Sequence, residues 1–302
     1  MPDRSALARL QQCTTAAAVA GAAAWFAWHV RSSLVAACIG AVLILFCYSP
    51  VLALEFAFLR RVIRHDPVPQ PDGRQLIRAW WRETVHGWQV FYWRQPFRWR
   101  AVPDSLGAQT HGRRGVVFIH GFVCNRGFWT PWLHALRADN RAFVAVNLEP
   151  VFGSIERYPA IVEAAVRQVT QATGLPPVLV CHSMGGLAAR AWLRSIGYAS
   201  RVHRVITIGS PHRGTWLARF SRLANGRQMQ RSGEWLEQLA RDEAGAALPP
   251  FTCWYSNCDN IVFPPSTCTL PHADNRLVTG AAHVELAFRP EVMQGSLALV
   301  SG

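Results

Sequence analysis

The sequence predicts an α/β fold: a mostly parallel sheet with helices on both faces, preceded by a transmembrane helical hairpin. From about residue 100 onward, short apolar runs alternate with segments of helical periodicity. Strands that alternate with helices imply parallel pairing, because the connecting helices cover the faces of the sheet. Two long apolar stretches precede this region, and residues 215–249 interrupt the alternation. We therefore divide the chain into a membrane anchor, residues 1–64, and an α/β domain, residues 65–302, with an insertion at about 215–249.

Residues 12–30 and 34–54 are the two apolar stretches, and only Arg31, Ser32 and Ser33 separate them. Each stretch is long enough to cross a hydrocarbon core of about 30 Å as a helix. Two such helices would return the chain to the side on which it starts. The first stretch could instead be a cleaved signal peptide, but its length and its two tryptophans favour an uncleaved anchor.

Arginine carries the net charge of +13, since the chain contains no lysine. Basic residues near the ends of membrane spans favour the cytoplasmic side. We therefore expect both ends of the hairpin, and the α/β domain, on the cytoplasmic face of a bacterial-type inner membrane, with membrane lipids as partners. Arg31 lies within the turn; the arginines outside it are Arg4, Arg9, Arg60, Arg61 and Arg64. Glu55 is expected to mark the end of the second span.

Aromatic residues and arginines are interleaved over residues 74–100. Such a pattern occurs where bases of single-stranded nucleic acid stack and where a chain lies among lipid headgroups. No recognised nucleic-acid-binding module accompanies it, so we expect no nucleic-acid partner. We interpret the segment as a helix next to the membrane, followed by the first strands of the sheet around Trp88–Trp93.

The elements of the α/β domain follow from apolar runs and from apolar residues at helical spacing. Strands are expected within residues 115–122, 142–148, 178–182, 202–208, 251–256 and 276–280. Helices are expected from Thr130, around 161–169 and over 186–196. The insertion contains two short amphipathic segments, which could cap the core or form a lid over a pocket at the carboxyl ends of the strands.

Eight cysteines would allow disulfides in an oxidising compartment. Several of them lie in or beside the predicted spans. Cys253, Cys258 and Cys268 are close together but lack the spacing of metal ligands, so we interpret them as reduced packing residues.

The stretch from Val178 to Gly186 is an apolar run that ends at Ser183 and opens a helix. A nucleophile elbow holds its serine in a strained strand-to-helix turn, and it needs small residues two positions before and after the serine. Gly185 meets this demand and Cys181 meets it partly, so the chain has one of the two glycines of the G-x-S-x-G pattern. The alternative is a serine that only caps a helix.

Five segments together make the chain resemble the α/β-hydrolase superfamily, and within it the lipase and esterase branch. The resemblance covers roughly residues 100–300 and reproduces the family's order of serine, acid and histidine. The segments are His120-Gly121-Phe122, Cys181-His182-Ser183-Met184-Gly185, the Gly209–Thr215 turn, Asn257–Pro264 with Asp259, and Gly280–Val284 with His283.

The resemblance implies a role for each site residue. Ser183 is the nucleophile, His283 the base that accepts its proton, and Asp259 the acid that orients the imidazole. The backbone amides of Phe122 and Met184 form the oxyanion hole. This mechanism requires no metal and no organic cofactor.

Other residues compete for these roles. His212 and His272 are the rivals of His283, and Asp274 is the rival of Asp259; His272 and Asp274 precede a strand instead of following one. We expect a membrane-anchored serine hydrolase that cleaves carboxylic esters with an apolar acyl part, an ester or lipid-like small molecule. A thioesterase, amidase or acyltransferase of the same fold, or a catalytically silent membrane scaffold, are the alternatives.

Overall fold

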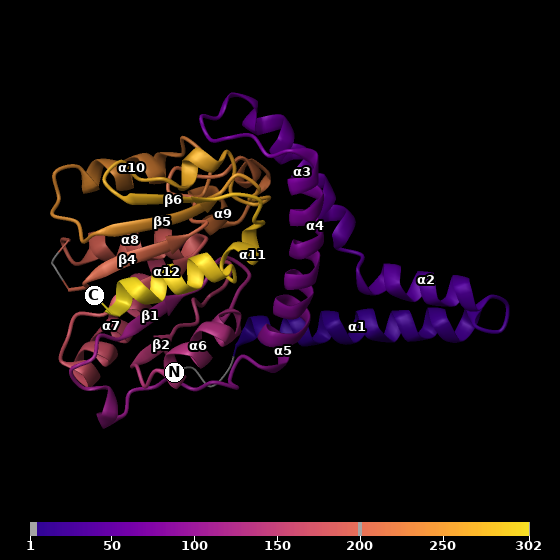
Figure 1. Cartoon of the computed structure of the whole chain (residues 1–302), viewed down its shortest axis with the longest axis horizontal. Helices are drawn as coiled ribbons and strands as arrows, with labels where there is room; N and C mark the ends of the chain where they lie inside the picture. The colour runs from indigo at the N-terminus through magenta and orange to yellow at the C-terminus, as the bar shows by residue number, and fades with distance from the viewer. Residues whose placement is uncertain (1–4, 199–200, 302) are drawn as a thin grey trace.

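A six-stranded parallel sheet lies at the centre of the structure, a computed structural model that describes residues 5–198 and 201–301 (Figure 1). Its strand order is β2-β1-β3-β4-β5-β6, and all neighbours are parallel. The predicted parallel sheet is therefore confirmed. The strands are β1 (Val116–Ile119), β2 (Phe143–Ala145), β3 (Val178–His182), β4 (Arg204–Ile208), β5 (Phe251–Ser256) and β6 (Asp274–Val278).

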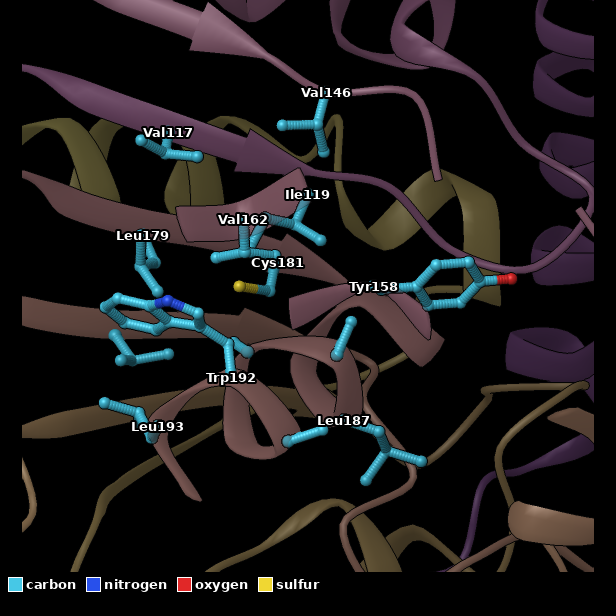
Figure 2. Close-up of a cluster of buried hydrophobic side chains, with 14 of the residues drawn as sticks. Val117, Ile119, Val146, Tyr158, Val162, Leu179, Cys181, Leu187, Trp192 and Leu193 are labelled. Atoms are coloured by element: carbon cyan, nitrogen blue, oxygen red, sulfur yellow. The ribbon is translucent and has the colours of Figure 1, made fainter. Parts of the chain in front are cut away.

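Helices cover both faces of the sheet. Alternate residues of a strand point to opposite faces, so Val117 of β1 joins one core cluster and Val116 the other. The first cluster is covered by α7 (Pro159–Thr173) and α8 (Met184–Ser195), and Figure 2 shows part of it. The second is covered by α6 (Thr130–Ala138) and α12 (Pro290–Ser301).

The insertion begins with η6 (Trp216–Phe220) and α9 (Ala224–Gln228) and ends with α10 (Glu234–Glu243). A buried ion pair ties α10 to the core, because both carboxylate oxygens of Glu243 accept hydrogen bonds from Arg190, at 2.8 and 2.6 Å. The same guanidinium donates to the carbonyl of His212. The insertion is thus held to α8 and to the turn after β4.

The N-terminal helices are α1 (Ala6–His29), α2 (Leu34–Leu45), α3 (Ser49–Val62) and α4 (Gly73–Gly87). Helices α1 and α2 pair as a hairpin that projects from the rest of the molecule (Figure 1). Within the described chain, no helix alone has both the length and the apolar character needed to cross a bilayer; α2 and the helical segment to His65, bent by 57°, have them only together. The predicted second span is divided because α2 ends before Pro50, which lies in the first turn of α3.

Helices α3 and α4 pack against the α/β body. Phe56 and Leu59 of α3, with Ile63 directly after that helix, form a third buried cluster with Phe263 and Ala282 of the body. In Figure 1, α3 and α4 stand beside α11, and α4 contacts α11 (His283–Leu286) directly. The division into residues 1–64 and 65–302 stays a prediction, although the end of the first segment contributes to this core.

The strand expected around Trp88–Trp93 is wrong. Helix α4 continues as a π-helix, η2 (Trp88–Arg94). Trp88 and Tyr92 stack with ring centroids 6.4 Å apart, a pairing of residues four apart that a helix permits and a strand does not. The remaining short helical turns are η1 (Ile63–His65), α5 (Gln95–Phe97), η3 (Ala108–Thr110), η4 (Arg126–Trp129), η5 (Ile155–Arg157) and η7 (Pro265–Cys268).

Candidate active site

Ser183 occupies the turn between β3 and α8, where it has a φ of 53° and a ψ of −128°. A positive φ is costly for a residue with a Cβ and occurs where surrounding structure enforces it. Here the backbone amide of Ser183 donates to the carbonyl of Ile208 at the end of β4, 2.9 Å away. This strand–turn–helix geometry is that of a nucleophile elbow. Only 6% of the residue is exposed.

Glycines permit the close approaches that this turn requires. A Cβ on Gly185 would lie 2.4 Å from the carbonyl oxygen of Ile119 and 2.8 Å from that of His120. A Cβ on Gly121 would lie 2.8 Å from the Cβ of Ser183. The carboxyl end of β1 therefore passes directly beside the elbow.

Replacing Gly185 with alanine is expected to destabilise the protein by roughly 1–3 kcal/mol, because the contacted atoms are backbone and cannot move without displacing β1. Thermal unfolding of the purified variant measures the loss. Gly73→Ala is the matched control, since nothing lies within 4 Å of its added Cβ at the start of α4. An unchanged melting temperature for Gly185→Ala would contradict the prediction, because it would mean that the elbow accepts a Cβ at this position without a clash.

Cys181 stands two residues before Ser183, where the G-x-S-x-G pattern has its first glycine. Its side chain is fully buried in the first core cluster and lies among Ile119, Val162 and Trp192 (Figure 2). Burial raises the pKa of its thiol far above the ordinary value, so it remains a neutral packing group. The departure from glycine is thus accommodated by the core.

Asp259 and His283 form a buried pair. The Nδ1–H of His283 donates to Oδ2 of Asp259 at 2.9 Å, and the two residues are 5% and 0% exposed. The other carboxylate oxygen, Oδ1, accepts the amides of Ile261 and Val262 at 2.9 and 2.7 Å. These bonds fix the carboxylate, and the carboxylate fixes the imidazole with Nδ1 protonated and Nε2 free to accept a proton.

The structure brings this pair to the elbow. A Cβ on Gly209, the residue after Ile208, would lie 3.0 Å from Oδ2 of Asp259 and 3.2 Å from Nδ1 of His283. His182, the residue before Ser183, donates from Nε2 to the carbonyl of His283 at 3.2 Å. The residue before Ser183 and the end of β4 beside the elbow therefore both lie against the Asp259–His283 pair.

The environment of His283 favours a protonated imidazole. Burial opposes the charge, but the charge and hydrogen bond of Asp259, together with the charges of Glu83 and Glu55, raise the pKa of His283 above its ordinary value. His182 is affected in the opposite sense, because burial and the neighbouring His283 lower its pKa well below the usual range. Only one of the two adjacent imidazoles is therefore suited to carry a positive charge.

Phe122 and Met184, whose amides are the expected oxyanion donors, lie in the two turns that meet at the serine. Phe122 follows Gly121, which contacts Ser183, and Met184 is the first residue of α8. His120 keeps the first of these turns in place: it donates from Nδ1 to the carbonyl of Gly121 and accepts the amide of Leu148 at Nε2. The role of the Phe122 and Met184 amides as oxyanion donors stays a prediction.

The rival residues lie in other surroundings. His212 is buried with its Nε2 3.0 Å from Oγ1 of Thr207 and 3.7 Å from Sγ of Cys253. His272 is exposed, and the exposed Asp274 pairs with Arg276. Of these histidines, the structure brings His283 to a buried carboxylate.

Three residues around His283 were not expected from the sequence to belong to the site. Asn260 accepts the amide of His283 through its side-chain oxygen at 3.2 Å and donates to Glu55 of α3 at 2.7 Å. Glu83 of α4 accepts the amides of Val284 and Glu285. Glu55 therefore contacts the body, where the sequence suggested the end of a membrane span. A single glutamate within an otherwise apolar helical face is the signal that could have identified Glu83.

The arrangement of a parallel sheet, a strained serine turn after β3 and an acid–histidine pair after β5 and β6 defines a class of proteins, the α/β-hydrolases. Residues 116–291 match the model of the alpha/beta hydrolase family. This match covers more than half of the chain, and the chain belongs to that family.

Two solved forms of one lipase support the same fold. The mature form of Bacillus licheniformis lipase BlEst2 is similar with a TM-score of 0.57 and 16% identity, over 63% of this chain and 93% of that one. Its propeptide form is similar with a TM-score of 0.55 and 18% identity, over 66% of this chain and 51% of that one. Aspergillus fumigatus lipase B has a lower TM-score of 0.49, with 20% identity over 72% of this chain and 56% of that one. At these identities the likeness concerns the fold alone. No curated protein matches the chain significantly in sequence.

Proposed function

We propose that the protein is a membrane-anchored serine hydrolase that cleaves carboxylic esters with an apolar acyl part. One observation carries the reaction type: a serine in a strained strand-to-helix turn directly follows His182, which contacts His283 of a buried, hydrogen-bonded Asp259–His283 pair. The serine at the elbow is the nucleophile, and the imidazole and carboxylate are its base and orienting acid.

In the proposed reaction, Oγ of Ser183 attacks the ester carbonyl carbon while Nε2 of His283 takes its proton. The negative charge of Asp259 stabilises the imidazolium, and the amides of Phe122 and Met184 stabilise the oxyanion. The tetrahedral intermediate collapses to an acyl-serine, and His283 returns the proton to the departing alkoxide, which leaves as the alcohol. Water, activated by the same imidazole, then releases the carboxylic acid.

The apolar preference is supported by aromatic side chains near the elbow. Phe122 follows Gly121, which touches Ser183, and packs edge to face against the exposed Phe152, with centroids 5.9 Å apart. In the insertion, Trp216 packs against Phe220, which is exposed. A similar fold occurs in a protein described as a lipase, which agrees with an acyl chain as the group recognised.

Labelling with a fluorophosphonate probe tests the reaction type. The probe reacts with serines that a neighbouring base activates, so the purified protein should be labelled at Ser183 and should hydrolyse short p-nitrophenyl esters. Identification of the modified peptide by mass spectrometry locates the label. A folded protein that neither reacts with the probe nor cleaves any ester would favour a silent scaffold.

The anchor is proposed from the exposed surface of the α1–α2 hairpin. Its exposed side chains are largely apolar, and two tryptophans, Trp25 and Trp28, lie near the turn. An apolar surface of this extent marks a binding site for a protein or a membrane, and tryptophans favour the bilayer interface. Its exposed large apolar residues are Leu10, Val19, Trp25, Phe26, Trp28, Val30, Leu34, Val35, Ile39, Val42 and Leu43.

Placing aspartates at both Ile39 and Leu43 should release the protein from membranes, because each charge costs about 2.5–3.5 kcal/mol at the centre of a span. Carbonate-washed membranes of expressing cells should retain the unaltered protein and lose the double variant. Leu106→Asp, on the body, is the control and should stay with the membrane. Unaltered protein that washes off in carbonate would contradict the anchor.

We further propose that the catalytic domain faces the cytoplasm, since five arginines flank the hairpin sequence outside its turn and Arg31 alone lies within it. Reporters active on only one side of the membrane, fused after residue 302, measure the orientation. Strong periplasmic activity with a silent cytoplasmic reporter would reverse the proposed topology.

A further inference from the structure

Glu83 of α4 is an acidic residue that the proposed reaction does not use, and it is 2% exposed. Its Oε1 accepts the amide of Val284 at 2.9 Å, and its Oε2 accepts the amides of Val284 and Glu285, both at 3.0 Å. These are the two residues directly after His283. The carboxylate thus holds the backbone that carries the proposed base.

Glu55 of α3 reaches the same loop through one intermediary. Its Oε2 accepts the side-chain amide of Asn260 at 2.7 Å, and the oxygen of that amide accepts the backbone N–H of His283 at 3.2 Å. Asn260 directly follows Asp259. The second carboxylate therefore fixes the acid and the histidine relative to each other.

Packing alone does not require a buried carboxyl group from Glu83 and a half-buried one from Glu55 at this contact. Apolar side chains of α3 and α4 already form a buried cluster with the body, and a buried carboxylate costs free energy that an apolar residue would not. Both carboxyl groups contribute favourably to the charged form of His283. The hydrogen bonds of Glu83 and Glu55 and their negative charges thus all act on His283.

We propose that Glu83, together with Glu55 acting through Asn260, positions His283 for catalysis and supplies negative charge that stabilises its imidazolium. The proposal rests on the proposed function, in which His283 is the base. Positioning matters because displacement of a reacting group by about 1 Å can cost about 100-fold in rate. The carboxylates contribute charge without touching the substrate.

The charge makes the pH dependence of hydrolysis a diagnostic measurement. His283 faces Asp259 after β5, His182 at the end of β3, Glu83 of α4 and Glu55 of α3. Glu83 also faces Asp259 and the start of α11, where Glu285 pairs with Arg82 and Arg289. Burial raises the pKa of Glu83 to about 7, against the opposing effect of its backbone hydrogen bonds. Glu83 is thus ionised at pH values above about 7.

The variants Glu83→Gln, Glu83→Ala and Glu55→Gln separate charge from position. Removing the charge of Glu83 lowers the pKa of His283, so the acid limb of kcat should move to lower pH by about half a unit to one unit. Glutamine keeps one acceptor oxygen and alanine keeps none, so the plateau kcat should fall about tenfold in the first and about 100-fold in the second. Glu55→Gln retains an oxygen for Asn260 and should shift the acid limb with little loss of kcat.

Rates are normalised to the fraction of protein that reacts with the fluorophosphonate, which removes the effect of unfolded molecules. Glu237→Gln on α10 makes the same change in net charge at an exposed position and should behave as the unaltered enzyme. If unaltered protein labels at Ser183 but the acid limb of Glu83→Gln does not move, this inference is overturned and the proposed function stands. If unaltered protein does not label at all, the proposed function falls first. Should Glu83→Ala fail to fold, Glu83→Gln decides alone.

Discussion

Hydrolysis of p-nitrophenyl butyrate by the Ser183→Ala variant is expected to fall on the order of 10⁶-fold in kcat, with complete loss of fluorophosphonate labelling. Removing the nucleophile of a serine, acid and histidine arrangement leaves only the contributions of binding and of the oxyanion donors, which accounts for the size of the effect. Alanine also has a Cβ, so the strain at a φ of 53° changes little and the fold should be kept.

The control for this variant is Ser210→Ala. Ser210 is buried in the turn after β4 and its Oγ lies close to Gly186, so it is a second serine near the elbow with no role in the proposed reaction. This variant should keep its activity and its label at residue 183. Undiminished labelling of Ser183→Ala would assign the nucleophile to another residue.

His283→Ala is expected to be nearly as damaging as the loss of the serine, about 10⁵–10⁶-fold in kcat, because an unactivated hydroxyl is a poor nucleophile near neutral pH. The rate of fluorophosphonate labelling should fall in parallel, which separates a lost base from a lost substrate contact. His212→Ala and His272→Ala are the matched controls. The assignment fails if either of these inactivates the enzyme while His283→Ala remains active.

Most of the fold could be predicted because local patterns dictate it. Apolar runs bounded by turn residues form strands in the structure, as in Phe251–Ser256. Val162, Val166 and Val169, which recur at helical spacing, form the buried face of α7. The surroundings of the N-terminal helices were harder to predict, because Ala-rich and Leu-rich helices have the same sequence pattern whether lipid or protein covers them. Leu59 and Ile63 are buried in a protein core, and its other members come from distant parts of the sequence, so only the tertiary structure defines it.

The candidate site divides in the same way. Ser183 lies in a local motif, and Asp259 and His283 follow expected strands, so pattern and resemblance together pointed to them. Glu83 and Asn260 act through hydrogen bonds to backbone amides at and after His283, which no sequence pattern records. The π-helix at Trp88–Arg94 was missed because interleaved arginines and aromatics imitate the alternation of a strand.

The contact between α4 and the His283 loop also affects how the protein matures. Glu83 and Val284 are 201 residues apart in the chain, so their hydrogen bond closes a very long loop, and contacts of such separation slow folding. During synthesis, α3 and α4 leave the ribosome long before the segment that carries His283. A nascent chain can therefore form the serine turn before its base is in place. The proposed site is therefore complete only after the C-terminal part of the chain has been synthesised and has packed against α4.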